Sequence, residues 1–167
     1  MQSLEQKLTL YHGSSVVVEN PMIMQSPRTL DFGEGFYTTT NKQQAQIFAR
    51  KVFDRRKTGT ATVSIYEINF EAAVQELRVL RFSSPDKNWL DYVMQNRNGA
   101  YDGQVYDIVF GPVANDDVYV TIGAFEAGIL TIEQTIAGLK VKKLFDQLVL
   151  KSDQSLSWLK YLDNFVL

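Results

Sequence analysis

A histidine followed by glycine provides the first candidate site. Tyr11-His12-Gly13-Ser14 holds the only histidine of the sequence and overlaps the end of an expected strand over 8–12. Because glycine has no side chain, it leaves the imidazole and the neighbouring backbone amides accessible to a ligand. The alternative is a histidine with a structural place in the core or on the surface, which is commoner for a single histidine.

Two glycines one residue apart precede the second candidate. Within Asp31-Phe32-Gly33-Glu34-Gly35-Phe36-Tyr37 they predict a tight turn that leads into a strand over 36–40. The turn would bring Tyr37 to the edge of a concave surface, whereas strand propensity alone favours a tyrosine packed in the core. The two glycines are not a dinucleotide-binding fingerprint, because the third glycine and the strand–loop–helix context are missing.

A polar cluster provides the third candidate. Asn115-Asp116-Asp117 follows an apolar strand over 106–110, which we expect Gly111-Pro112 to end. The cluster either forms a binding loop or caps a helix over 118–127. The sequence leaves both alternatives open.

Composition excludes several kinds of site. The 167 residues are 45% hydrophobic and 22% charged, so we expect one globular domain over 1–167. With no cysteine and one histidine, we expect no disulfide, no thiol nucleophile and no metal site. The net charge of −2 gives no footprint for duplex nucleic acid, although a local basic patch is compatible with it. Polar residues within the first 15 positions predict no secretory leader, and no apolar run approaches the ~20 residues that span a bilayer, so we expect a cytoplasmic protein without membrane contact.

One long helix is expected after the second candidate. Asn41 is a good N-cap because its side chain can accept from the first free amides. An apolar face follows, formed by Ala45, Phe48, Ala49, Val52 and Phe53. Basic residues gather towards its end: Arg50, Lys51, Arg55, Arg56 and Lys57. They are typical of a solvated face, and a phosphate-binding patch is the less favoured alternative.

Strands and loops surround this helix. Prolines make 19–31 a loop with at most one helical turn. Strands are expected over 60–70 and 77–82, since both are rich in β-branched, aromatic and aliphatic residues. The apolar phase slips at Tyr66, which predicts a bulge there.

Two further helices are expected in the second half. Ser84 would cap the first, which should end near Gly99. Thr131 and Gln134 have the spacing of a capping box for the second.

The chain should end with a strand and a helix. The strand covers 147–150, and Asp153 caps a terminal helix that carries Leu156, Leu159 and Leu162. The total is six strands and about five helices without a regular βαβ alternation. This pattern predicts an α+β fold.

The first two stretches resemble motifs of one enzyme superfamily. Tyr11-His12-Gly13-Ser14 resembles the W-H-G-S signature of ADP-ribosyltransferases of the histidine–tyrosine–glutamate branch, the poly(ADP-ribose) polymerase and diphtheria-toxin type. The segment from Phe32 to Tyr37 resembles their F-G-x-G-I-Y segment, and Phe48 matches a second aromatic eleven residues later. Asp146-Gln147-Leu148-Val149-Leu150 is similar to their N-E-Y-I-V-Y strand, with glutamine in the glutamate position.

The whole chain also resembles a bacterial family of unknown function. The shared motifs are Y-H-G-S, D-F-G-x-G-F-Y and Y-D-I-V-x-G-P-V-A-N-D, in this order. Members of that family resemble toxins of toxin–antitoxin pairs. This resemblance implies a small antitoxin protein as a partner.

The superfamily resemblance implies a fold and a set of contacts. Two small, mainly antiparallel sheets would form a cleft for NAD. Gly13 would pair through its backbone with the nicotinamide carboxamide, and Tyr37 and Phe48 would offer flat faces to the cationic ring. His12 would hydrogen-bond a ribose hydroxyl. Further contacts to the nucleotide are expected from Ser14, Gly35 and Thr38.

The implied reaction cleaves the nicotinamide–ribose bond of NAD. We expect mono-ADP-ribosyl transfer to a protein or nucleic-acid acceptor; NAD hydrolysis, an inactive NAD-fold binding module and a nucleotide-independent interaction protein are the alternatives. Gln147 is uncharged and cannot act as a general base, but it can hold the ribose 2′-OH. Asp116 or Asp117 is then the candidate for the missing charge, followed by Glu34.

Overall fold

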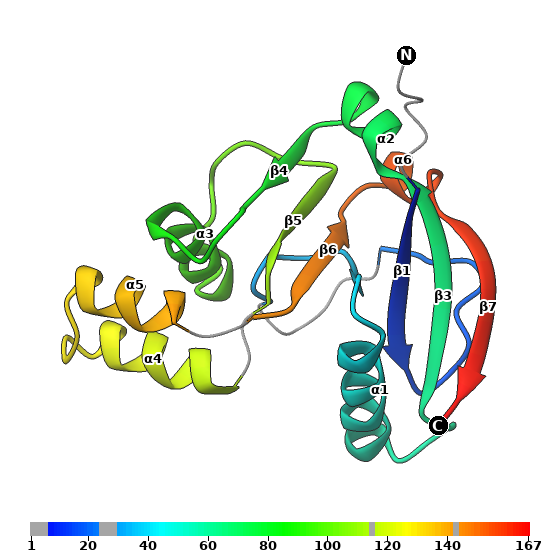
Figure 1. The fold of residues 1–167 in the computed structure, drawn as a ribbon, viewed down its shortest axis with the longest axis horizontal. Helices are drawn as coiled ribbons and strands as arrows, with labels where there is room; N and C mark the ends of the chain where they lie inside the picture. Colours follow the sequence, from blue (N-terminus) through cyan, green and yellow to red (C-terminus); the bar gives the residue numbers. More distant parts are fainter. Residues whose placement is uncertain (1–6, 24–29, 114–115, 142–143) are drawn as a thin grey trace.

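The computed structural model describes residues 7–23, 30–113, 116–141 and 144–167, and it has an α+β fold (Figure 1). In these residues seven strands alternate irregularly with six helices. The strands are β1 (Lys7–Ser14), β2 (Phe36–Thr39), β3 (Thr62–Asn69), β4 (Val79–Arg81), β5 (Ile108–Pro112), β6 (Asp146–Leu150) and β7 (Lys160–Val166). The helices are α1 (Lys42–Arg56), α2 (Phe70–Glu76), α3 (Lys87–Arg97), α4 (Asp116–Glu126), α5 (Ile132–Lys140) and α6 (Asp153–Leu156). None of the helices in the described part of the chain is long and apolar enough to cross a membrane.

All seven strands belong to one open sheet, in the order β4-β5-β6-β2-β1-β3-β7. Neighbours are antiparallel except β4 and β5. The two halves of the sheet, β4-β5-β6-β2 and β1-β3-β7, meet where β1 and β2 share the single register pair Tyr11↔Thr39. We expected two separate sheets, and this pair is the reason that the structure has one.

The two faces of the sheet are covered differently. One face carries a continuous apolar cluster that draws Leu10 from β1, Phe36 from β2, Ile108 from β5 and Leu148 from β6. The opposite face carries two separate clusters. The first lies over β5 and β6, and the second lies over β1 and β3. Each half of the sheet is therefore packed by its own helices on this second face.

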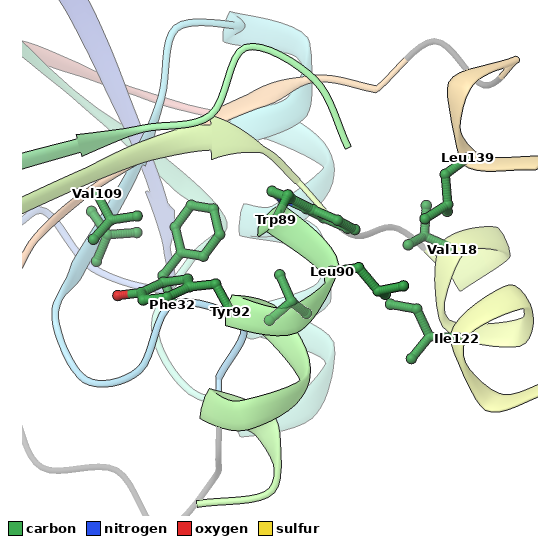
Figure 2. Packing of buried hydrophobic residues seen from close by; sticks show 10 residues of the cluster. Phe32, Trp89, Leu90, Tyr92, Val109, Val118, Ile122 and Leu139 are labelled. Atoms are coloured by element: carbon green, nitrogen blue, oxygen red, sulfur yellow. The ribbon is translucent and has the colours of Figure 1, made fainter. Parts of the chain in front are cut away.

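Helices α3, α4 and α5 cover the first of these separate clusters (Figure 2). Trp89 is fully buried, and its ring Nε1 donates to the Pro112 carbonyl at 3.0 Å, which ties α3 to the end of β5. Figure 2 shows Leu90 of α3 reaching towards Ile122 of α4. These contacts fix the helical side of the molecule to β5.

Several predicted features are confirmed. Asn41 accepts from the Gln44 amide at 2.8 Å and caps α1, and Thr131 and Gln134 form a capping box on α5. The register shift in the β3–β7 ladder lies between Ile65 and Tyr66, at the expected bulge. The expected turn of helix within 19–31 falls partly on 24–29, outside the described residues.

The first three differences from expectation concern the middle of the chain. The helix expected from Ser84 begins instead at Lys87, with Asp86 as its cap, because the Asp86 carboxylate accepts from the Trp89 amide at 2.9 Å. Gly111-Pro112 does not end β5, since both residues pair with the start of β6. Helix α2, which was not expected, lies between the two strands expected over 60–70 and 77–82, and Asn69 caps it.

The C-terminal helix was predicted wrongly. Helix α6 covers only Asp153–Leu156 and is capped by Ser152 rather than by Asp153. Residues 160–166 form β7, which pairs antiparallel with β3 along most of its length. Pairing with an existing strand edge outweighs a helical spacing of leucines, because it satisfies backbone groups on two strands at once.

Helix α1 packs closely on β1, and Gly13 permits it. A Cβ at Gly13 would lie 2.2 Å from the Ala45 carbonyl oxygen and 2.7 Å from the Ala49 amide nitrogen. Ala45 and Ala49 are buried at this contact. The helix backbone therefore lies directly against the strand, and only glycine fits there.

Gly13→Ala should lower the free energy of unfolding by about 1–3 kcal/mol, because the added methyl forces α1 away from β1. The measurement is urea unfolding at neutral pH. Gly123→Ala in α4 is the matched control, since a Cβ at Gly123 meets nothing within 4 Å and alanine favours a helix. Equal destabilisation by both substitutions would contradict the close packing at Gly13.

Candidate functional site

The two N-terminal motifs face each other across the split between β1 and β2. After the pair Tyr11↔Thr39, β1 continues through His12, Gly13 and Ser14, and antiparallel β2 leads back towards Tyr37 and Phe36. No further register pair joins these two strands, which are both described in full. On its other side β1 is fully paired, for example Gly13↔Val63. The split therefore lies between the two motifs that sequence analysis selected.

The His12 side chain bridges this split. Its Nδ1 lies 2.6 Å from the Tyr37 carbonyl oxygen, and because a carbonyl only accepts, Nδ1 carries the proton. In the neutral ring Nε2 is then the acceptor. The imidazole also stacks on Phe36, with ring centroids 4.3 Å apart. Histidine thus joins the two half-sheets where the backbone ladder does not.

His12 is neutral at physiological pH. Burial lowers the pKa of His12 from 6.5 to about 4; the hydrogen bond to the Tyr37 carbonyl opposes this shift, and the charge of Arg56 adds to it. A neutral imidazole can accept a hydrogen bond from a hydroxyl through Nε2, but it carries no charge to stabilise an anion.

The Tyr37 hydroxyl organises the segment 31–35 that precedes β2, called here the glycine loop. It donates to the Gly33 carbonyl at 2.6 Å and accepts from the Phe32 amide at 3.1 Å. Burial raises the pKa of Tyr37 well above its usual value, and the negative charge of Asp31 adds to this shift. The tyrosine is neutral, and its ring packs against the cluster over β5 and β6.

Lys151 holds the same loop from the other side. Its Nζ donates to the Phe32 carbonyl, and to the Glu34 carbonyl at 2.8 Å. Burial lowers the pKa of Lys151 to about 8, while the Glu34 carboxylate opposes this shift. Gly33 lies between these partners with φ +77°, and a Cβ there would lie 2.9 Å from Nζ. Sequence analysis missed Lys151, since a lysine after a strand has no distinguishing pattern.

Asp31 is a buried carboxyl group at the start of this loop. The Tyr119 hydroxyl on α4 donates to it at 3.2 Å, and the Arg97 guanidinium lies over the Tyr119 ring at 4.2 Å. The aspartate therefore connects the loop to α3 and α4. The motif D-F-G-x-G-F-Y contains Asp31, but nothing in its spacing predicts these partners.

Gln147 is the most unusual polar residue near the split. It is 5% exposed, and its Nε2 has no hydrogen-bond partner among the residues that the structure describes. It pairs with Thr39 of β2 on one side and with Gly111 of β5 on the other. A buried amide without a partner costs about 1–3 kcal/mol, so a ligand acceptor at this atom would be favourable.

The α1 face of the sheet presents Gln147 in the gap between two clusters. Paired residues of antiparallel strands point to the same face, so Tyr11, Thr39 and Gln147 share one. Tyr11 packs with Ala45 and Ala49 of α1, which identifies this face. Gln147 and Thr39 thus lie where the cluster under α1 ends and the cluster under α3 begins.

Phe48 stands on the flank of α1 that faces this gap. It is 43% exposed, contrary to its expected place on the buried face of the helix. Phe53 of α1 packs near Phe165, and the ammonium of Lys42 lies over that ring at 4.8 Å, so this flank faces β7. At 100° per residue Phe48 projects from the opposite flank, towards β2 and β6.

The predicted residues do not all lie on one face. Gly13, Tyr37 and Gln147 belong to the α1 face, whereas alternation places His12, Ser14 and Thr38 on the other. Thr38 is buried there, and its hydroxyl donates to the Leu148 carbonyl at 2.7 Å. Gly35 lies against β6, since a Cβ there would meet the Val149 side chain at 2.5 Å. The split itself is bordered by residues of both faces.

The carboxylate candidates are dispersed. Asp116 is the first residue of α4, and its side chain lies outside what the structure describes, as does Asn115. Asp117 is exposed on the same helix, so the two aspartates lie in the first turn of α4. Glu34 lines a shallow depression of about 260 Å³ with Lys151 and Tyr101. A neighbouring depression of about 340 Å³ shares Tyr101, and neither is lined by His12, Tyr37 or Gln147.

Comparison with known proteins identifies a family. A family model described as a protein of unknown function, DUF3990, matches residues 8–161. The chain belongs to the DUF3990 family. No curated protein and no solved structure matches it. The three motifs of this family member therefore have to be interpreted from their own geometry.

Protonation of His12 should destabilise the protein in acid. The folded-state pKa of about 4 lies below the ordinary histidine pKa of 6.5, so the stability that the neutral ring contributes is complete above pH 6.5 and is lost as the pH falls towards 4. Between pH 7 and 4 the wild type should lose about 1–3 kcal/mol more than His12→Gln, which cannot titrate. Urea unfolding at both pH values measures this difference. Equal losses would show that the imidazole is not kept neutral by the fold.

The Tyr37 hydroxyl should stabilise the glycine loop measurably. Tyr37→Phe leaves the Gly33 carbonyl and the Phe32 amide without this partner, and we expect a loss of about 1–3 kcal/mol in the free energy of unfolding. Tyr101→Phe is the control, because its hydroxyl donates only to the exposed Gln104 carbonyl. A Tyr37→Phe protein no less stable than the control would remove the loop role.

Proposed function

We propose that this DUF3990 protein is an NAD-dependent mono-ADP-ribosyltransferase with an ADP-ribosyltransferase-like fold, acting at the split between β1 and β2. The observation that carries the proposal is the buried, unpartnered Nε2 of Gln147. This residue is the second of β6, the strand at which the resemblance assigns the third site position. It lies beside the split that the other two motifs border.

The residues around the split fit a nicotinamide nucleotide. Gly13 is paired by β3 on one side only, so its backbone is suited to pair with a carboxamide on the other. The exposed ring of Phe48 offers a flat apolar face to a cationic pyridinium ring. The Gln147 amide donates to a ribose hydroxyl, and His12 Nε2 accepts from another.

Bound NAD supplies a glycosidic bond, and its cleavage leaves positive charge on the ribose carbon as nicotinamide departs. The residues of the chain hold the nucleotide in position for this step. The amide of Gln147 fixes the sugar, and its oxygen dipole is the nearest substitute for a carboxylate. The neutral state of His12 keeps repulsive positive charge away from the site. An acceptor nucleophile on a protein or nucleic acid then takes the ADP-ribose.

A second candidate function is an inactive NAD-binding module, and the uncharged Gln147 favours it. NAD hydrolysis is the variant of the enzyme proposal in which water is the acceptor. The toxin role and the small antitoxin partner are part of the proposal through the resemblance of the whole chain. Transfer and hydrolysis differ in the acceptor of ADP-ribose, which is a macromolecule in the first and water in the second. Labelled ADP-ribose shows which acceptor is used.

NAD should bind and be cleaved, and Gln147 should be needed for both. Millimolar NAD should raise the melting temperature, since a ligand selective for the folded state stabilises it. Gln147→Ala should reduce turnover of NAD labelled in its adenylate about 10- to 1000-fold, equivalent to ~1.4–4 kcal/mol of barrier. The assay follows label on protein, nucleic acid and free ADP-ribose after incubation with cell lysate. No thermal shift and no calorimetric heat would contradict the nucleotide proposal.

Two further variants test which residue supplies the negative charge that a glutamate would have provided at position 147. Gln147→Glu restores the carboxylate of the superfamily and should preserve or raise cleavage if no other carboxylate is close. If Asp116 supplies that charge, the added glutamate repels it and raises one pKa, so that activity falls. Measuring Gln147→Glu and Asp116→Asn singly and together separates these cases. Binding of NAD without cleavage in every variant would instead favour the inactive module.

A further inference from the structure

The C-terminal half of α1 concentrates positive charge on a protein of net negative charge. Its exposed basic residues are Arg50, Lys51, Arg55, Arg56 and Lys57, and the same segment contains one acid, Asp54. The whole chain has a formal net charge of −2, so this basic end is opposite in sign to the rest. A local cluster of positive charge indicates a negatively charged partner more directly than the net charge of the whole chain does.

The helix dipole explains only part of this arrangement. Arg55 and Arg56 lie in the last turn, where cations favour a helix C-terminus. The effect falls off within that turn, so it does not account for Arg50 and Lys51. Lys57 follows as the C-cap with φ 57°. Basic residues thus continue on both sides of the turn that the dipole stabilises.

The basic end projects beyond the sheet and surrounds the helix axis. Arg56 has nearly the helical phase of Ala45, Ala49 and Val52, which are buried on the sheet, yet it is exposed. Figure 1 shows the end of α1 lying past the end of β1. The other basic residues project in several directions around this free end. A helix end with cations on several sides can contact several groups along an extended ligand.

This end of α1 is fixed near the split. The loop after the helix is attached to β1, because the Thr60 amide donates to the Ser15 carbonyl at 2.9 Å. Gly59 packs on the same carbonyl, where a Cβ would lie at 2.1 Å. The charge of Arg56 is one of the causes that lower the pKa of His12. A ligand on the basic end would therefore lie beside the proposed NAD site.

We propose that the basic end of α1 binds the phosphate backbone of a nucleic acid, independently of NAD. The number of charges favours this ligand over the pyrophosphate of NAD. A pyrophosphate needs about two cations, whereas five exposed cations over roughly 10 Å of helix match successive phosphates of a chain. Neutralising these phosphates releases counterions, which supplies affinity without any sequence preference.

The test is fluorescence anisotropy with a labelled 20-nucleotide single-stranded RNA and the full chain, without NAD. We expect binding that is about 10- to 100-fold weaker at 200 mM than at 50 mM salt, as three to five phosphate contacts require. The triple variant Arg50→Gln, Arg55→Gln, Arg56→Gln should bind at least about 10-fold more weakly at 50 mM salt. Lys57 is left intact because a substitution at its left-handed backbone position could change stability as well as charge.

A second triple variant gives the matched control. Lys87→Gln, Lys140→Gln, Lys160→Gln removes the same charge from exposed positions on α3, α5 and β7 and should leave binding within about two-fold. Both variants must keep the wild-type melting temperature. Absence of binding at 50 mM salt, or equal weakening by both variants, overturns the proposal. If the α1 variant loses the NAD-induced thermal shift while RNA does not bind, the patch serves the dinucleotide and the proposal is wrong. Failure of NAD to bind leaves the RNA result unaffected.

Discussion

The structure depends on how two half-sheets are joined with very little backbone pairing. One register pair, Tyr11↔Thr39, and one side-chain hydrogen bond, from His12 to the Tyr37 carbonyl, connect β1 to β2. A ladder would satisfy the backbone groups along both strands, whereas this join leaves part of them to side chains or ligands. The energetic cost of the open join is offset on the opposite face, where one apolar cluster runs across both halves. The split can therefore stay open without separating the molecule.

The glycine loop beside this join is rigid, although its sequence looks like a flexible one. Tyr37 and Lys151 together hold the carbonyls of Phe32, Gly33 and Glu34. Glycine is needed at 33 because of its positive φ, and at 35 because β6 approaches closely. A loop held by this many charge-assisted and hydroxyl hydrogen bonds keeps one geometry when a ligand arrives. This rigidity is what a site needs if it must orient a sugar rather than close around it.

Local patterns predicted the elements well where local interactions decide them. The Asn41 cap, the Thr131–Gln134 capping box and the bulge beside Tyr66 each depend on neighbouring residues, and all three are confirmed. Predictions failed where a distant strand decides the outcome, as for β7, which takes the residues of an expected helix, and for Gly111-Pro112, which pairs with β6. The sequence predicted the two motifs that border the split, but not the split itself. Their position opposite each other depends on the pairing of β1 with β2. The roles of Lys151 and Asp31 depend on contacts over 80 to 120 residues.

Neutral groups dominate the split, and this limits the chemistry that it can perform. Burial keeps His12 uncharged at pH 7, Tyr37 is an ordinary neutral phenol whose pKa burial raises further, and Gln147 has no ionisable group. A cationic sugar would then be stabilised by oriented dipoles, whose effect is greatest where water is excluded. The nearly complete burial of Gln147 provides such a setting. The amide also avoids a penalty that glutamate would incur, because a buried carboxylate without a partner is far more costly than a buried amide. If the proposed activity holds, glutamine at this position would exchange part of the electrostatic stabilisation of the transition state for stability of the protein without ligand, which would suit a slow transferase or hydrolase better than a polymer-forming enzyme.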